Sequence, residues 1–228
     1  MIGGPGKLPI SIADFIARFP NLYHMAEPNS WPSIRKYGLL STTALLDLFE
    51  IRGQLRNALE SQHRAHSVAI THPKYGTAVI RDQKPLREIP LAKCLIDITP
   101  TQWYRILNGY VFFWVTQQRL NTLLSARAYR GKIHTVITVD SARLFETNSK
   151  CVRLSPINSG STIYNPRPRG VDTFQPLSTY SFEERRRMRG LANAIAELAV
   201  RHSVLDISKC VLAVGHYRNG KLIERLRS

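Results

Sequence analysis

Two stretches decide the fold, Leu22-Tyr23-His24-Met25-Ala26 near the start of the chain and Ala194-Ile195-Ala196-Glu197-Leu198-Ala199-Val200 near its end. The first predicts a strand that carries one His, and a short helix predicted to end at Gly38 follows it. The second predicts an apolar strand interrupted by a single carboxylate. A lone buried carboxylate costs free energy unless it is paired or used in chemistry. His24 and Glu197 are therefore the first candidates for functional residues.

The rest of the chain alternates between helical and extended patterns without an internal repeat. A length of 228 residues allows one large core, so a single domain over 1–228 is expected. Because the elements do not form a regular βαβ repeat, the fold class expected is α+β with antiparallel pairing. Helices are expected over 11–19, 29–37, 44–49, 52–62, 86–94, 101–107, 116–126 and 141–145, and strands over 22–25, 67–71, 77–80, 111–115, 133–139, 195–200, 209–216 and 221–226.

The chain is strongly basic. It has 32 Lys and Arg against 16 Asp and Glu, a formal charge of +16, and an isoelectric point near 10.3. The second half carries more of the excess, with 19 basic and 8 acidic residues over 115–228. Arg outnumbers Lys 23 to 9, which favours bidentate phosphate contacts. A nucleic-acid or other polyanionic partner is the natural inference, and an acidic protein partner is the alternative.

Compartment and metal content follow from what the sequence lacks. The start, Met1–Pro9, is rich in Gly and Pro without the apolar core of a signal peptide, and no apolar run reaches the length of a membrane span. The three cysteines are widely spaced, so reduced thiols, no metal site and a cytoplasmic location are expected.

The two ends and the central aromatic strand resemble the DarT-type DNA ADP-ribosyltransferases. In that family a strand-His-helix-Gly-Leu unit opens the fold, as Tyr23-His24 and Gly38-Leu39-Leu40 do here, and a strand with the catalytic Glu closes it. The opening also resembles an uncharacterised bacterial family with Tyr-His-Met-Ala at this place. The resemblance implies an ADP-ribosyltransferase-like split antiparallel β core of two small sheets, with peripheral helices outside and NAD in the cleft.

By this resemblance Glu197 is the catalytic residue, and His24, with Tyr23 beside it, binds the ribose of NAD. Cleavage of the nicotinamide–ribose bond develops positive charge on the ribose, which a carboxylate stabilises. The same carboxylate can accept a proton from the incoming nucleophile. From the residues alone, a core His and a solvent-facing Glu on an edge strand remain alternatives.

The resemblance also implies an active-site Arg upstream of the aromatic strand. Arg81 is the best-placed candidate and would hold the pyrophosphate of NAD, although a solvated turn is the alternative. Arg56 and Arg119 are competitors for this role. Tyr110, Trp114 and Tyr164 are the aromatic candidates for the place beside nicotinamide.

The segment 155–190 is a candidate acceptor-recognition loop region. It holds four prolines and six Arg against three acidic residues, and a loop of this length is more often functional than not. The alternatives are a Pro-stiffened surface loop and, for its last Arg run, a solvated helix face. The candidates for substrate binding are Asn158, Ser159, Ser161, Tyr164, Arg167, Arg169, Arg185, Arg186 and Arg187.

The function expected is transfer of ADP-ribose from NAD to RNA or DNA, by a bacterial toxin or defence effector that has an antitoxin or immunity partner. Two alternatives remain open. One is an RNA 2′-phosphotransferase-like enzyme, which shares the NAD-using fold. The other is a non-catalytic basic module that binds nucleic acid.

Overall fold

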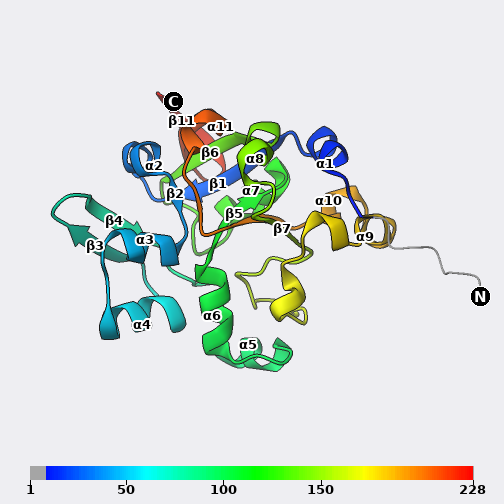
Figure 1. Cartoon of the computed structure of the whole chain (residues 1–228), viewed down its shortest axis with the longest axis horizontal. Coiled ribbons are helices and arrows are strands. Elements are labelled where there is room, and N and C mark those ends of the chain that lie inside the picture. Colours follow the sequence, from blue (N-terminus) through cyan, green and yellow to red (C-terminus); the bar gives the residue numbers. More distant parts are fainter. Residues whose placement is uncertain (1–8, 228) are drawn as a thin grey trace, which may run out of the picture.

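A seven-stranded antiparallel sheet crosses the middle of the protein in the computed structural model, which describes residues 9–227 (Figure 1). The strand order is β11-β10-β6-β1-β5-β8-β7. Two further pairs lie outside this sheet, β2 with β9 and β3 with β4. The strands of the large sheet are β1 (Asn21–Ala26), β5 (Tyr110–Trp114), β6 (His134–Asp140), β7 (Val152–Ser155), β8 (Glu197–Arg201), β10 (Val211–Arg218) and β11 (Lys221–Leu226). The strands of the pairs are β2 (Leu39–Leu40), β3 (Val68–His72), β4 (Gly76–Ile80) and β9 (Ser203–Val204).

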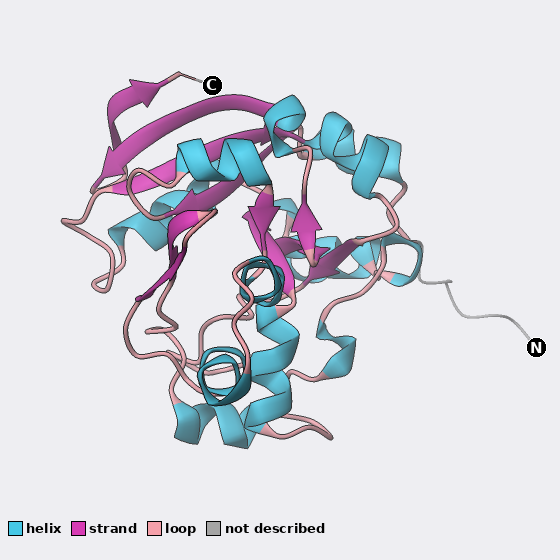
Figure 2. Cartoon of the chain, turned by 60° about the vertical axis from the view of Figure 1, so that its left-hand side comes forward, coloured by secondary structure: helices cyan, strands magenta, loops and turns pink. Residues whose placement is uncertain are grey.

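The large sheet is almost divided between β1 and β5. Strand β1 pairs with β6 over six residues, but it pairs with β5 only at Tyr23 and Trp114. Strand β5 then pairs with β8 along its whole length. One half is therefore β11-β10-β6-β1 and the other is β5-β8-β7, and Figure 2 shows the strands of the two halves running in different directions.

Helices surround both halves of the sheet. Phe15 of α1, Trp31 of α2 and Phe145 of α8 bury against one face in the largest core cluster. Leu120 and Leu124 of α7 cover the opposite face. The helices are α1 (Ile12–Arg18), α2 (Trp31–Tyr37), α3 (Thr42–Leu48), α4 (Gly53–Ser61), α5 (Glu88–Cys94), α6 (Pro100–Asn108), α7 (Gln117–Ser125), α8 (Ser141–Asn148), α9 (Phe182–Arg189), α10 (Leu191–Ala194) and α11 (Ile207–Cys210), with single 3₁₀ turns at Val171–Thr173 and Leu177–Thr179.

The side chains of β1 alternate between the two faces of the large sheet, so this short strand contributes to the packing on both. Successive side chains of a strand point to opposite faces. Leu22 accordingly joins the main core cluster, whereas Tyr23 packs with the α7 cluster on the other side. His24 follows on the face of Leu22, at the point where β1 and β5 separate. The local sequence thus directs the imidazole into the division of the sheet.

The turn from α2 into β2 requires glycine. Gly38 has φ +90 and ψ 166, a region that residues with a Cβ rarely adopt. A Cβ on Gly38 would also stand 2.8 Å from the Cα of Leu205, just beyond β9. The close approach lets β2 pair with β9, which follows the strand that begins with Glu197.

The expected α+β class with antiparallel pairing is confirmed, and three details differ. The two small sheets expected are halves of one sheet, because the Tyr23–Trp114 pair joins them. Residues 209–210, expected to start a strand, end helix α11, because a helical turn buries both Ile207 and Cys210. Strand β7, inside a stretch without a strand prediction, pairs with β8 and covers the edge that β8 would otherwise expose.

Two expectations concern the chain's relation to membranes. Within residues 9–227, no helix combines the length and apolar character needed to cross a bilayer. The expectation drawn from Met1–Pro9 concerns residues that, apart from Pro9, lie outside the described part of the chain.

Candidate active site

A cavity of about 590 Å³ lies at the division of the sheet. Both halves of the sheet contribute to it, with His24 from β1, Tyr110–Trp114 from β5 and Glu197 from β8. Helix α2, the hairpin β3–β4 and the start of the long loop complete the wall, through Tyr37, Arg81 and Ser159 among others. The cavity therefore brings together side chains from near both ends of the sequence, as the resemblance implied for His24 and Glu197.

His24 is partly buried and hydrogen-bonds across the division of the sheet. Its Nδ1 lies 2.9 Å from the carbonyl oxygen of Phe112. Because a carbonyl only accepts, Nδ1 carries the proton and Nε2 of the neutral ring keeps a lone pair. Burial, together with a smaller effect of the Arg81 cation, lowers the pKa of His24 to about 4 against the opposing effect of the Phe112 bond. The imidazole is therefore neutral at pH 7 and can accept a hydrogen bond from a hydroxyl.

Glu197 is the first residue of β8 and is only 4% exposed. The alternative of a solvent-facing Glu is therefore wrong. Ser159 donates to its Oε2 from the backbone N–H at 3.1 Å and from the hydroxyl at 2.7 Å. Burial raises the pKa of Glu197 to about 7, although the two bonds from Ser159 and the charges of Arg119 and Arg169 oppose this rise. A carboxyl group poised near neutral pH suits proton transfer.

Arg81 follows the last residue of β4 and lines the same cavity. Its guanidinium forms an ion pair with Glu27 at 3.2 Å and donates to the carbonyl of Met25 at 3.1 Å. It also lies over the ring of Tyr129, 5.4 Å from the centroid. These three contacts fix the guanidinium at one wall of the cavity. The solvated-turn alternative is wrong for Arg81.

The aromatic candidates divide among three places. Tyr110 and Trp114 line the cavity, and Trp114 pairs directly with Glu197 in the sheet. Tyr23 does not line the cavity, and its side chain packs with the α7 cluster. Tyr164 is 95% exposed and lines a different pocket. Tyr110 and Trp114 are therefore the aromatic candidates that line the cavity, and Trp114 is the one next to Glu197.

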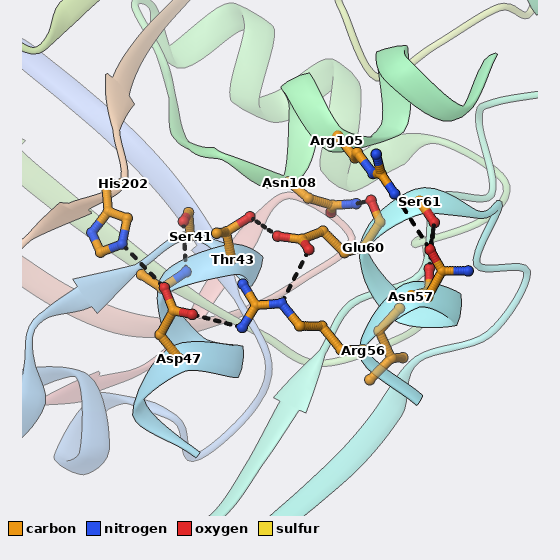
Figure 3. A network of polar contacts seen from close by, with 12 residues as sticks. Ser41, Thr43, Asp47, Arg56, Asn57, Glu60, Ser61, Arg105, Asn108 and His202 are labelled. Carbon is orange, nitrogen blue, oxygen red and sulfur yellow. Dashed lines mark hydrogen bonds and ion pairs between the residues drawn. The ribbon is translucent and has the colours of Figure 1, made fainter. Parts of the chain in front are cut away.

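Arg56 lies outside the cavity, so its expected part in cofactor binding is not supported. Its guanidinium forms ion pairs with Asp47 at 2.6 Å and with Glu60 at 3.2 Å (Figure 3). Glu60 also accepts from Thr43, and Asp47 lies 3.6 Å from His202 (Figure 3). Arg56 therefore links α3 to α4, and Asp47 connects α3 to His202 in the turn after β8.

A second pocket of about 520 Å³ lies beside the cavity, and we call it the arginine pocket. Asn158 lines both. Of the expected substrate-binding residues, Asn158, Ser161, Tyr164, Arg167 and Arg169 line this pocket, and Ser159 lines the cavity. The pocket also contains Arg119, Arg189 and Asn193, which the sequence did not assign to acceptor binding.

The run Arg185–Arg187 lines neither hollow. Arg186 forms an ion pair with Glu183 at 2.9 Å, and Arg185 lies over the ring of Tyr180. Arg189, at the end of the same helix, reaches the arginine pocket instead. The expected place of the run in a substrate site is therefore not supported.

The fold and site together define the class: an α+β protein with a carboxylate and a histidine facing one cavity at a divided antiparallel sheet. The chain belongs to the family described as "Family of unknown function (DUF7002)", whose pattern matches residues 20–211. No curated protein matches the chain. The matched stretch contains His24, Arg81, Glu197 and the whole arginine pocket.

Proposed function

We propose that this protein is an NAD-dependent ADP-ribosyltransferase that modifies a nucleic acid. One observation carries the proposal: His24 and Glu197, from distant parts of the sequence, line one cavity where the antiparallel sheet divides. By the resemblance to DarT-type enzymes, these two residue types would meet around NAD.

The residues of the cavity fit NAD as the donor substrate. Its volume falls within the range of small-molecule sites. Arg81 supplies a fixed cation for the pyrophosphate, and Nε2 of His24 supplies an acceptor for a ribose hydroxyl. Tyr110 and Trp114 offer aromatic surface for the nicotinamide ring.

Glu197 is the protein residue that takes part in the proposed reaction. Transfer breaks the bond between the ribose C1′ and the nicotinamide nitrogen, and the electron pair leaves with neutral nicotinamide. A bond then forms between C1′ and the acceptor nucleophile, whose proton passes to the carboxylate. Among the described residues, Oε1 of Glu197 has no hydrogen-bond partner, so one oxygen remains for substrate while Ser159 holds the other.

A nucleic-acid acceptor is supported by charge. The chain carries a net charge of +16, and the arginine pocket adjoins the cavity through Asn158. An enzyme that modifies nucleic acid in the cell that makes it would be harmful, so we place it among toxins or defence effectors. An antitoxin or immunity protein and a cytoplasmic location are parts of this proposal.

The proposal is tested by incubating the protein with labelled NAD and, separately, RNA, DNA or protein. Label is expected in RNA or DNA, and it should be lost when Glu197→Gln replaces the wild type. Label only in protein would contradict the acceptor, and the absence of NAD turnover in every pool would contradict the enzyme.

The same experiment separates the alternatives. A 2′-phosphotransferase-like enzyme does not depend on a single essential Glu, so full activity of Glu197→Gln would favour it. A non-catalytic module would bind nucleic acid in a salt-dependent way without a thermal shift from NAD.

A further inference from the structure

We propose that the arginine pocket binds a terminal phosphate monoester of the acceptor strand. The inference rests on the nucleic-acid acceptor of the proposed function and adds the chemical group that the protein recognises on it. Four observations support it: the charge of the pocket, the way its arginines are held, its size, and its connection to Glu197.

The pocket is a concentration of positive charge. Its lining contains four arginines, Arg119, Arg167, Arg169 and Arg189, and no acidic residue. Within residues 9–227, none of the four forms an ion pair with a carboxylate. The carboxylate that acts on two of them, Arg119 and Arg169, is that of Glu197. Because the pKa of Glu197 is raised to about 7, this single group leaves most of the charge uncompensated.

The protein holds two of these guanidinium groups, those of Arg119 and Arg169, with neutral acceptors. Arg119 donates to the carbonyl of Ala192 at 3.2 and 3.3 Å and to the side chain of Asn193 at 3.0 Å. Arg169 is only 2% exposed and donates to the carbonyls of Ser159, Ser161 and Arg167. Carbonyl oxygens fix a guanidinium without cancelling its charge. The pocket is therefore preorganised for an anion.

The charge and size favour a monoester over a chain phosphodiester. A phosphate monoester carries nearly two negative charges at pH 7, whereas a diester carries one. The pocket is a single hollow of about 520 Å³, large enough for one nucleotide. Asn158, Asn193 and the exposed ring of Tyr164 could contact its sugar and base.

The pocket is connected to the candidate catalytic carboxylate through two short links. Ala196, the neighbour of Glu197, lines the pocket, and Asn158 lines both hollows. Arg169 donates to the carbonyl of Ser159 at 3.0 Å, and Ser159 in turn holds Glu197. A terminal nucleotide in the pocket would therefore lie next to the site of transfer.

The test measures binding of a short labelled oligonucleotide by fluorescence anisotropy without NAD. The same strand is prepared with a 5′-phosphate, a 3′-phosphate or hydroxyl groups at both ends. We expect one phosphorylated strand to bind about tenfold more tightly than the hydroxyl strand, as one charge-assisted hydrogen bond implies.

The variant is the pair Arg167→Gln and Arg189→Gln. Arg167 is exposed, and Arg189 makes one long bond, at 3.4 Å to the carbonyl of Pro156, so the fold should remain intact. The control is Arg218→Gln with Arg225→Gln, which removes the same charge on exposed residues of β10 and β11, at the other end of the sheet. Because any lost cation weakens nucleic-acid binding, the readout is the ratio between the affinity for the phosphorylated strand and the affinity for the hydroxyl strand.

The preference for the phosphorylated strand should disappear in the Arg167/Arg189 variant and persist in the Arg218/Arg225 control. Equal binding of all three strands by the wild type would overturn the inference, as would a preference that survives in the Arg167/Arg189 variant. A protein that shows the expected preference but never consumes NAD would support the arginine pocket and contradict only the proposed transferase activity.

Discussion

Ser159 donates two hydrogen bonds to a single oxygen of Glu197, one from its backbone N–H and one from its hydroxyl. The bonds attach the long loop after β7 to the first residue of β8. Arg169 holds the other side of Ser159 through the carbonyl oxygen. The position of the carboxylate therefore depends on the conformation of the loop, and the same loop forms the arginine pocket.

Substitution Ser159→Ala should raise the pKa of Glu197 further. Hydrogen bonds to an ionised carboxylate stabilise the charged form, and this change removes one of the two. The acidic limb of the pH–rate profile for NAD turnover should move up by about one pH unit. Ser161→Ala is the control, because the Ser161 hydroxyl accepts from the N–H of Ile163 and does not contact Glu197. An unchanged profile in Ser159→Ala would show that Glu197 does not set the acidic limb.

The raised pKa of Glu197 also predicts how stability depends on pH. The pKa is about 7 in the folded protein, against 4.5 for a Glu side chain in water, so the folded state binds the proton more tightly. The resulting contribution to stability is fully present below pH 4.5 and is lost as the pH rises through about 7. The difference corresponds to about 3 kcal/mol.

Urea denaturation at a series of pH values measures this effect. Glu197→Gln cannot ionise, so its free energy of unfolding relative to the wild type should rise by up to about 3 kcal/mol between pH 5 and pH 8. A constant difference between the two proteins across this range would show that Glu197 has an ordinary pKa.

His24 should remain neutral in mildly acidic solution. Burial lowers its pKa to about 4, and its Nδ1–H is committed to the carbonyl of Phe112. Nitrogen-15 NMR of the imidazole should show the Nδ1–H tautomer at pH 6, with protonation only near pH 4. Titration of His24 near pH 6.5, the ordinary pKa of a histidine, would contradict the buried geometry of the site.

Substitution Gly38→Ala should destabilise the protein more than Gly190→Ala. Both glycines have similar dihedral angles, with φ 90 and ψ 166 at Gly38 and φ 76 and ψ 164 at Gly190. Both changes should therefore cost about 1–3 kcal/mol of backbone strain. Only at Gly38 does the new Cβ meet backbone, at 2.8 Å from Leu205, which should add about 1–3 kcal/mol. Chemical denaturation of the two variants measures the difference, and equal losses would contradict the close approach.

Much of the fold was predictable because the local patterns agree with it. The apolar run Val111–Val115 and the β-branched run Ile133–Val139 overlap strands β5 and β6. Strand β7 was not predicted, because the alternation of its four residues, Val-Arg-Leu-Ser, is shorter than a typical strand and runs directly into the long loop. Its strand conformation comes from pairing with β8, a tertiary effect.

The candidate site, too, could be predicted from the sequence only in part. Glu197 could be selected as a lone carboxylate in an apolar strand, and His24 through the resemblance of the opening segment to DarT-type enzymes. Ser159 was expected to bind substrate, but nothing in its sequence context indicates that it holds Glu197. Arg119 and Arg189 come from α7 and α9, so their meeting in the arginine pocket depends on the packing of the two helices beside the long loop. Local sequence patterns do not contain that information.

The release of nicotinamide from NAD by wild type and Glu197→Gln, compared at saturating NAD, tests the central claim most directly. Removing a group that stabilises the transition state should lower kcat by about 10²–10³ while NAD still binds, as a thermal shift from NAD would show. Arg225→Gln, on the far edge of the sheet, should retain the wild-type rate. Equal kcat values for wild type and Glu197→Gln, or no nicotinamide release by the wild type with any nucleic acid present, would contradict the account.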